Sequence, residues 1–339
     1  MPPISPRRAL SAATLTVTLL LLTTSWSDPS LGSRTPLTGS AASGPVSLTA
    51  STTTSRSTGV RAFGRSSYWN TPLGKAPVDP NSARYIRDAQ VAAHTQNHLR
   101  LVLGDWGMPS YRSDAGDPAY VIRPASGPTV KLHIPARARP MPTSDAALTV
   151  TDTASHQVVC LGGAHFDAAT HRWTAKTVSR YWSSSRGIAQ GLPGGTSGNL
   201  GHRGIPGSVQ AVTKKEIRRG AIRHRLEIYW WETAPRTPQG REAYFPMTGS
   251  ETRSVGTVPE GIVIRIRRSV DLTAEHLSPA ALTIARALKR YGAVVGDNSG
   301  TGNNLKLQAN ADWGGVLGAD SLRSIPWSDY VFVRGGYRP

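Results

Sequence analysis

Short runs of alternating apolar and polar residues recur along the chain from residue 119 onward, with glycine, proline, asparagine and aspartate between them. Such alternation gives a strand one apolar face and one polar face, and the intervening residues allow the chain to turn. The pattern predicts an all-β protein with two short helices, built as an antiparallel β-sandwich of the jelly-roll type. The runs are AYVIR (119–123), TVKLHIP (129–135), ALTVTD (147–152), HQVVCL (156–161), AIRHRLEIYWW (221–231), GIVIRIRR (261–268) and YVFVR (330–334).

Two segments show helical spacing. In the first, Ser278 can cap the helix, Pro279 occupies its first turn and Gly292 follows its last turn. Proline is favoured at a helix start and glycine just past a helix end, so we expect a helix from Pro279 to about Tyr291. A second helix is expected over residues 82–93.

A histidine interrupts the apolar face of the run 221–231. His224 shares that face with apolar residues, whereas Arg223 and Arg225 lie on the opposite face. The imidazole is therefore either a core group bonded to a neighbour or a catalytic acid or base. By the same alternation, Arg265 should lie on a solvated, basic face of the run 261–268.

The N-terminal segment has the layout of a signal peptide. Arg7 and Arg8 precede an apolar run, residues 9–22, that is short for a membrane span. We therefore predict a signal peptide over residues 1–27 and a secreted, extracellular protein that contacts the membrane only transiently, through this segment. An uncleaved N-terminal anchor is the alternative, and both Sec and twin-arginine export fit the paired arginines.

Composition divides the rest of the chain. Residues 28–61 consist largely of Ser, Thr, Gly, Pro and Ala, which cannot bury enough apolar surface to fold, so a disordered linker is predicted there. Residues 62–339 show no further break and are predicted to form a single domain.

The chain is strongly basic, with 39 Lys and Arg against 21 Asp and Glu, a formal net charge of +18. Few of these charges precede residue 62, so the excess belongs to the predicted domain. A positive exported protein attracts polyanions, and the expected partner is an acidic polysaccharide or a cell-wall polyanion. No nucleic-acid recognition module is present, so no specific nucleic-acid partner is predicted.

Metal and cofactor chemistry has little support in the sequence. Cys160 is the only cysteine, which excludes an intramolecular disulfide, and its apolar surroundings predict a small buried hydrophobe. The polar turn 296–304 loosely resembles a calcium loop, but Gln308 replaces the bidentate glutamate of its twelfth position. No H-E-x-x-H or comparable motif occurs, so no metal and no cofactor is predicted.

Five motifs occur in order: a glycine–proline turn, E-I-x-x-G-x-I-x-H, a helix ending A-L-x-x-Y-G, a strand ending in aspartate, and I-P-W. They lie at residues 202–207, 216–224, 287–292, 297 and 325–327. In these motifs the chain resembles a thinly characterised family of exported bacterial and fungal proteins, common in actinobacteria. The resemblance implies a β-jelly roll that acts on polysaccharide, which is a fold-level analogy. Where the family has an acidic residue after its central strand, this chain has Gly162 and Gly163.

The shared motifs supply the candidate site. Glu216, His224, Tyr291 and Asp297 are the candidate catalytic residues, because they lie near strand or helix ends, where a concave sheet would gather them. Structural roles are the alternative: Glu216 could pair with a nearby cation, Tyr291 could close its helix, and Asp297 could cap a turn. The candidate substrate-binding residues are His202, Arg203, Arg223, Arg225, Trp231 and Asn298.

Two chemistries use such a set. In glycoside hydrolysis, two carboxyl groups flank the scissile bond, and their separation decides between retention and inversion. In β-elimination from a uronate, cations neutralise the carboxylate while His or Tyr moves the proton. The sequence therefore predicts a secreted carbohydrate-active protein, a lyase or glycoside hydrolase acting on an acidic polysaccharide. The alternative is a non-catalytic protein that binds cell-wall or extracellular polysaccharide.

Overall fold

The structure, a computed structural model, describes residues 62–91, 96–201, 203–251, 255–300 and 302–339. The chain divides into two units, Met1–Ser57 and Thr58–Pro339, and every described residue belongs to the second. The predicted signal peptide (1–27), the predicted linker (28–61) and His202 lie outside the described residues.

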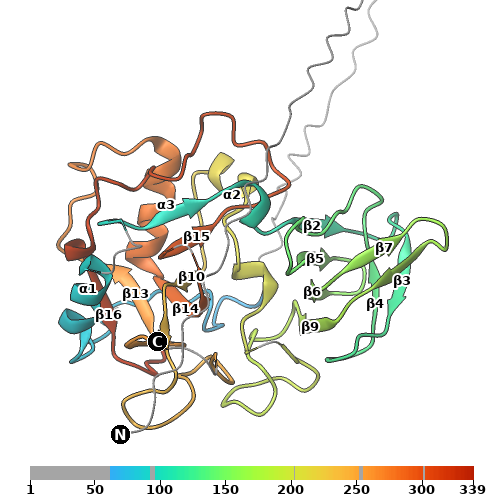
Figure 1. Ribbon diagram of the computed structural model, residues 1–339, viewed down its shortest axis with the longest axis horizontal. Helices are drawn as coiled ribbons and strands as arrows, with labels where there is room; N and C mark the ends of the chain where they lie inside the picture. The colour runs from blue at the N-terminus through green and yellow to red at the C-terminus, as the bar shows by residue number, and fades with distance from the viewer. Residues whose placement is uncertain (1–61, 92–95, 202, 252–254, 301) are drawn as a thin grey trace, which may run out of the picture. The chain divides into compact units, whose positions relative to one another are not determined.

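A six-stranded mixed sheet forms the larger part of the fold (Figure 1). In spatial order its strands are β1 (Arg100–Val102), β15 (Asn304–Lys306), β10 (Leu226–Trp230), β14 (Ala293–Asn298), β13 (Val263–Ile266) and β16 (Tyr330–Val333). The central pair, β10 and β14, is parallel, and so is the edge pair β1 and β15. The other pairs are antiparallel.

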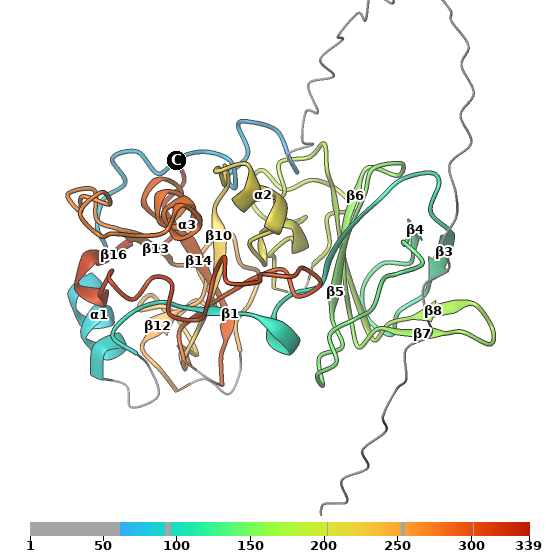
Figure 2. The ribbon, with the colours of Figure 1, turned by 90° about the horizontal axis from the view of Figure 1, so that it is seen from above.

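Helices cover one face of this sheet. Helix α3 (Pro279–Arg290) contacts β13, and helix α1 (Ser82–Val91) contacts β16 (Figures 1 and 2). The Ser278 hydroxyl accepts a hydrogen bond from the Ala281 amide, and Gly292 follows the helix with φ = 72°. The predicted helix at 279–291 is therefore confirmed, and so is the predicted helix at 82–93 as far as Val91. A third helix, α2 (Lys214–Arg218), was not predicted from the sequence.

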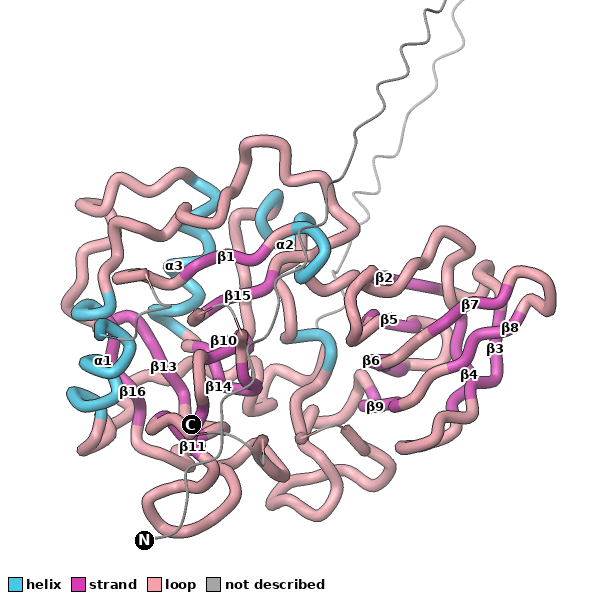
Figure 3. Tube along the Cα trace, in the orientation of Figure 1, coloured by secondary structure: helices cyan, strands magenta, loops and turns pink. Residues whose placement is uncertain are grey.

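A four-stranded sheet forms the second part of the fold. Its order is β2 (Ser110–Ser113), β5 (Leu148–Asp152), β6 (Gln157–Gly162) and β9 (Thr177–Trp182). Three two-stranded sheets accompany it: β3 (Ala119–Ile122) with β4 (Val130–His133), β7 (His165–Asp167) with β8 (Arg172–Thr174), and β11 (Thr233–Ala234) with β12 (Val258–Pro259). Loops and three 3₁₀ turns, Gly104–Trp106, Gly207–Val209 and Trp327–Asp329, connect the elements (Figure 3).

The two larger sheets share a hydrophobic core. Val158 and Tyr181 of the four-stranded sheet belong to the same buried cluster as Val263 and Val294 of the six-stranded sheet. The helices cover the other face of the six-stranded sheet, so its central strands are buried on both sides. This explains why all five residues of β10 are buried.

All seven predicted runs contain a strand, and the mostly β composition is confirmed. The observed strand orders do not by themselves confirm a jelly roll, because the larger sheet mixes parallel and antiparallel pairs. Two details of the alternating pattern are wrong. The strand predicted at 221–231 begins only at Leu226, and Arg265 is buried, with its guanidinium donating to carbonyl oxygens of Ile266, Gly74 and Lys289.

Within the described residues, none of the helices is long and apolar enough to cross a membrane.

Candidate active site

The parallel pair β10 and β14 assembles a polar cluster on the face of the sheet opposite the helices. We call it the Arg203 cluster, and its members are Arg203, Glu227, Tyr229, Glu251, Glu260 and Asp297. Glu227 and Tyr229 lie two residues apart on β10 and therefore point to the same side, and Tyr229 pairs in register with Asp297 of β14. The register shifts between Ile228 and Tyr229, which makes Gly296 an additional residue of β14. The Tyr229 hydroxyl donates to Glu227 Oε2 over 3.0 Å.

Arg203 gathers three carboxyl groups around this pair of strands. Its Nη2 donates to Asp297 Oδ1 at 2.7 Å, while its Nη1 lies 2.7 Å from Glu251 Oε1 and 3.5 Å from Glu260 Oε1. The backbone at Arg203 is left-handed, with φ = 52°, and Gly204 follows with φ = 93°. Because a β carbon at Gly204 would lie 2.6 Å from the Pro246 carbonyl oxygen, only glycine fits this turn.

Glu227 is a buried acid that stays protonated at neutral pH. It is 3% exposed, and burial raises the pKa of its carboxyl group from 4.5 to about 8. The negative charge of Asp297 contributes to this upward shift, whereas Lys306, the Tyr229 hydroxyl and Arg203 limit it. Near pH 7 Glu227 is therefore mainly a neutral acid that can donate a proton.

Glu260 is a second buried acid in the cluster. Burial raises the pKa of its carboxyl group to about 7, although Arg203 and the Glu251 amide lower it. Its Oε1 accepts a hydrogen bond from the Glu251 amide at 3.2 Å and lies 3.1 Å from the Thr233 hydroxyl oxygen. Its Oε2 is buried and has no hydrogen-bond partner among the described residues. A protonated Oε2 would supply an additional donor in this position.

Asn298 and Lys306 complete the surroundings. The Asn298 Oδ1 accepts hydrogen bonds from both the amide and the hydroxyl of Thr233, each at 2.7 Å, which holds the Thr233 hydroxyl oxygen 3.1 Å from Glu260 Oε1. The Lys306 ammonium lies 4.0 Å from the centroid of the Tyr229 ring, a cation–π distance. Asn298 therefore supports the cluster through Thr233.

The cluster reaches solvent through its ion-paired members. The Asp297 side chain is 35% exposed and that of Glu251 is 39% exposed, whereas that of Arg203 is 12% exposed. A protonated acid, Glu227, thus lies beside an ion-paired and accessible carboxylate, Asp297. Carboxyl groups in two such environments can serve as general acid and general base.

The structure divides the four predicted catalytic residues. Asp297 lies in the Arg203 cluster, but Glu216 and His224 pair with each other, with 2.7 Å between Glu216 Oε1 and His224 Nε2. Glu216 also completes the capping box of α2 with Thr213. Burial raises the pKa of Glu216, but the charge and hydrogen bond of His224 outweigh it, so the net shift is downward. This geometry gives both residues a structural role.

Tyr291 is the C-cap of α3 and is 6% exposed. Its carbonyl oxygen accepts a hydrogen bond from Nε of Arg225, whose guanidinium also donates to the carbonyl oxygens of Tyr68 and Thr71. Arg225 is fully buried, so it cannot contact a substrate in this structure. The structure gives Arg225 a structural role, because it donates to three loop carbonyl oxygens inside the fold.

The remaining predicted binding residues differ in their surroundings. Arg203 is central to the cluster, whereas Arg223 is exposed. The Trp231 amide donates to Asn303 Oδ1, and Trp231 lines a small cavity of about 120 Å³ together with Glu232.

Sequence reasoning missed Glu227, Tyr229 and Glu260. The available signal was a single acid inside the apolar run 226–230, on the strand face opposite His224. Covering that face with the second sheet turns the same acid into a buried, protonated group.

Cys160 adds no nucleophile, because burial raises the pKa of its thiol to about 11. Among the described residues, no group of three His, Cys, Asp or Glu side chains has the geometry to hold a metal ion.

No family model, curated protein or solved structure matches this chain.

Proposed function

We propose that the Arg203 cluster is the catalytic centre of a secreted carbohydrate-active enzyme that cleaves an acidic polysaccharide. The observation that supports it is the placement of Glu227 and Asp297 on adjacent parallel strands. Glu227 is buried and has a raised pKa, whereas Asp297 is partly exposed and paired with Arg203. Glycoside hydrolysis needs one carboxyl group that donates a proton to the leaving oxygen and one that acts as base or nucleophile.

In this proposal Glu227 is the general acid. Its protonation near neutral pH follows from burial and from the Asp297 charge, and the Tyr229 hydroxyl orients it. Asp297, positioned by Arg203, either activates a water molecule or attacks the sugar. Substrate would approach from the side where Asp297 and Glu251 reach solvent.

Hydrolysis fits the cluster better than β-elimination. A lyase needs a basic His or Tyr near the substrate, but burial and the Glu227 and Asp297 charges raise the pKa of Tyr229 well above its usual value. Tyr229 therefore stays protonated at neutral pH and cannot serve as the base. His224 is held by Glu216 and by the Arg225 carbonyl oxygen.

The preference for an acidic substrate rests on the net charge of +18. Secretion and a jelly-roll arrangement are proposals of the same kind, supported by the N-terminal pattern and by the mostly β composition.

The test is incubation of the chain with a panel of uronate-containing and neutral polysaccharides. New reducing ends would indicate hydrolysis, and the ultraviolet absorbance of unsaturated uronate would indicate elimination. Glu227→Gln should abolish product, whereas Glu242→Gln, at an exposed glutamate, should not. Absence of product across the panel, or equal product from Glu227→Gln, would contradict the catalytic role.

A non-catalytic polysaccharide-binding protein is the second candidate, favoured by the same positive charge. It predicts retention on cell-wall polysaccharide that is unchanged in Glu227→Gln and Asp297→Ala, without any product.

A further inference from the structure

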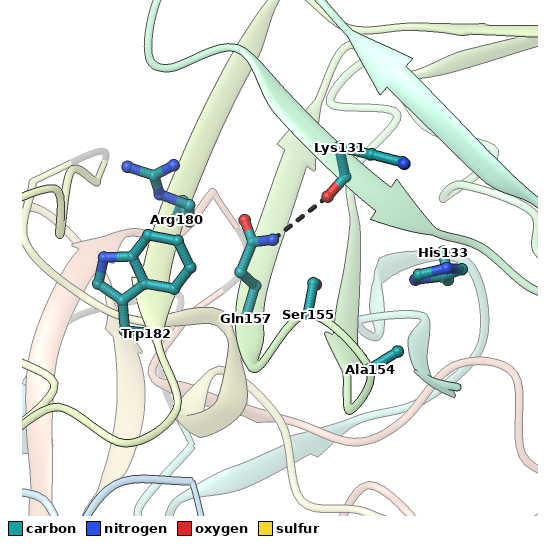
Figure 4. Close-up of a pocket in the computed structure, with 7 residues that line it drawn as sticks. All are labelled: Lys131, His133, Ala154, Ser155, Gln157, Arg180 and Trp182. Atoms are coloured by element: carbon teal, nitrogen blue, oxygen red, sulfur yellow. Dashed lines mark hydrogen bonds between the residues drawn. The ribbon is translucent and has the colours of Figure 1, made fainter. Parts of the chain in front are cut away.

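A second feature suited to a ligand lies in the four-stranded part of the fold. A cavity of about 390 Å³ lies where β4 passes the ends of β6 and β9 (Figure 4). Ligand pockets in proteins usually measure roughly 300–1,000 Å³, so this one suits a small group such as one or two sugar rings. It is lined by Lys131, His133, Ala154, Ser155, Gln157, Arg180 and Trp182.

Gln157 presents an unsatisfied acceptor in this cavity. The residue is 6% exposed, and its Nε2 donates to the Lys131 carbonyl oxygen over 3.2 Å. That bond fixes the orientation of the amide, since the reversed amide would place two acceptors against each other. Its Oε1 is buried and has no hydrogen-bond partner among the described residues. An unpaired buried acceptor is costly, and a ligand hydroxyl would satisfy it.

An aromatic ring and two cations surround this acceptor. Trp182 pairs in register with Gln157, and Arg180 lies two residues before Trp182, so all three side chains share one face of the sheet. The Arg180 guanidinium lies 4.6 Å from the Trp182 ring centroid, and its Nη2 donates to the Gly198 carbonyl oxygen. Lys131 is exposed at the rim of the cavity.

A buried carboxylate, that of Asp152, orients two of the residues that line the cavity, His133 and Ser155. Asp152 Oδ2 accepts hydrogen bonds from the His133 amide, from His133 Nδ1 and from the Ser155 hydroxyl. Burial raises the pKa of Asp152, but these hydrogen bonds outweigh it, so its net shift is downward. The ionised carboxylate therefore holds the His133 ring in place beside the cavity.

We propose that this cavity binds one uronic-acid residue of an acidic polysaccharide, separately from the Arg203 cluster. Arg180 would receive the carboxylate, and Lys131 at the rim would add positive charge on the other side of Gln157. Gln157 Oε1 would accept a sugar hydroxyl, and Trp182 would offer apolar surface to the pyranose ring. A phosphate group fits less well, because it offers no apolar face to Trp182. The site does not depend on turnover at Glu227.

The test is isothermal titration calorimetry of the full chain with tetragalacturonate, at physiological ionic strength. Cellotetraose, a neutral tetrasaccharide, and poly(glycerol phosphate) serve as comparison ligands. Using the Glu227→Gln variant prevents cleavage, so this binding site and the proposed catalysis can fail independently. We expect tetragalacturonate to bind at least about tenfold more tightly than either comparison ligand.

Four variants locate the binding. Trp182→Ala and Lys131→Ala should each weaken tetragalacturonate binding by about tenfold. Lys131 forms no ion pair among the described residues, so its loss should not disturb folding. Gln157→Leu removes the acceptor and should also weaken tetragalacturonate binding. Arg172→Ala, at an exposed arginine on β8, is the control and should bind like the parent chain.

Three outcomes would overturn the proposal. Parental affinity in both Trp182→Ala and Lys131→Ala would show that the ligand does not occupy this cavity. An equal loss in Arg172→Ala would show diffuse polyelectrolyte attraction. Tighter binding of poly(glycerol phosphate) would assign the site to phosphate polymers instead.

Discussion

The carboxyl group of Glu227 lies directly against the backbone of Gly296, where a β carbon would stand 2.2 Å from Glu227 Oε1. The clash is purely spatial, since Gly296 does not have a positive φ. Adjacent parallel strands thus approach closely enough to place the Glu227 acid beside Asp297.

Gly296→Ala should therefore displace the Glu227 carboxyl group. A shift of about 1 Å in a catalytic group costs on the order of 10²-fold in rate, and we expect a loss of that size in kcat on a substrate identified by the panel. Gly300→Ala is the matched control, because no atom lies within 4 Å of a β carbon there. Full activity in Gly296→Ala would remove Glu227 from the catalytic centre.

Turnover should decline at alkaline pH. Glu227 donates its proton only while protonated, and burial together with the Asp297 charge raises its pKa to about 8. We expect kcat/KM to fall as pH rises through about 8, and Glu227→Gln to lose about 10²- to 10⁴-fold activity throughout. A pH–rate profile that stays flat up to pH 10 would contradict this assignment.

The sequence predicted the secondary structure better than the site. Alternating runs and cap residues are local signals, so the strand at 263–266 and the helix at 279–290 could be read directly. Which side of a strand is buried depends on which element covers it, and no local pattern reports that. Arg265 was consequently assigned to a solvated face, and Glu227 was not recognised as a buried acid.

The candidate site shows the same limit. The sequence analysis selected Asp297, Arg203 and Asn298. The structure places Asp297 and Arg203 in one cluster, and Asn298 supports that cluster through Thr233. Glu260 precedes a different strand, and its place beside Arg203 depends on long-range pairing.

Glu227 should lower the stability of the fold at neutral and alkaline pH. Its pKa is 4.5 when unperturbed and about 8 in the fold, so between these values the folded state binds more protons than the unfolded chain. The stabilisation that comes from keeping Glu227 protonated is fully present below about pH 4.5 and is lost as pH rises through about 8, at about 1.4 kcal/mol per pH unit.

The variant Glu227→Gln removes this titration. We expect the variant to be increasingly more stable than the parent chain as pH rises from 5 to 8, measured by urea unfolding. Glu242→Gln, at an exposed position, should show no such trend. A constant difference between Glu227→Gln and the parent chain would mean that Glu227 is ionised in the fold.

Arg203→Met should destabilise the fold at neutral pH. It removes the cation from Asp297, Glu251 and Glu260, and a lost hydrogen bond to a charged group costs about 1.5–3 kcal/mol. Arg223→Ala, at an exposed arginine, should change the free energy of unfolding by less than about 0.5 kcal/mol. Equal effects of the two variants would show that Arg203 does not organise the cluster.

His224 provides the clearest separation between structure and catalysis. Its Nδ1 faces the Arg225 carbonyl oxygen at 2.8 Å, and its Nε2 faces Glu216 Oε1 at 2.7 Å. A carbonyl only accepts, and so does an ionised carboxylate, so both ring nitrogens must carry hydrogen. The ring is therefore held as a cation that joins α2 to the start of β10.

His224→Asn should break this link and leave Glu216 without its cation. We expect a loss of about 1–3 kcal/mol in the free energy of unfolding, with kcat essentially unchanged once the variant is folded. Urea unfolding and turnover of the same preparation measure the two effects. A variant as stable as the parent chain but without turnover would instead place His224 in the chemistry, because the loss could not then arise from the helix cap.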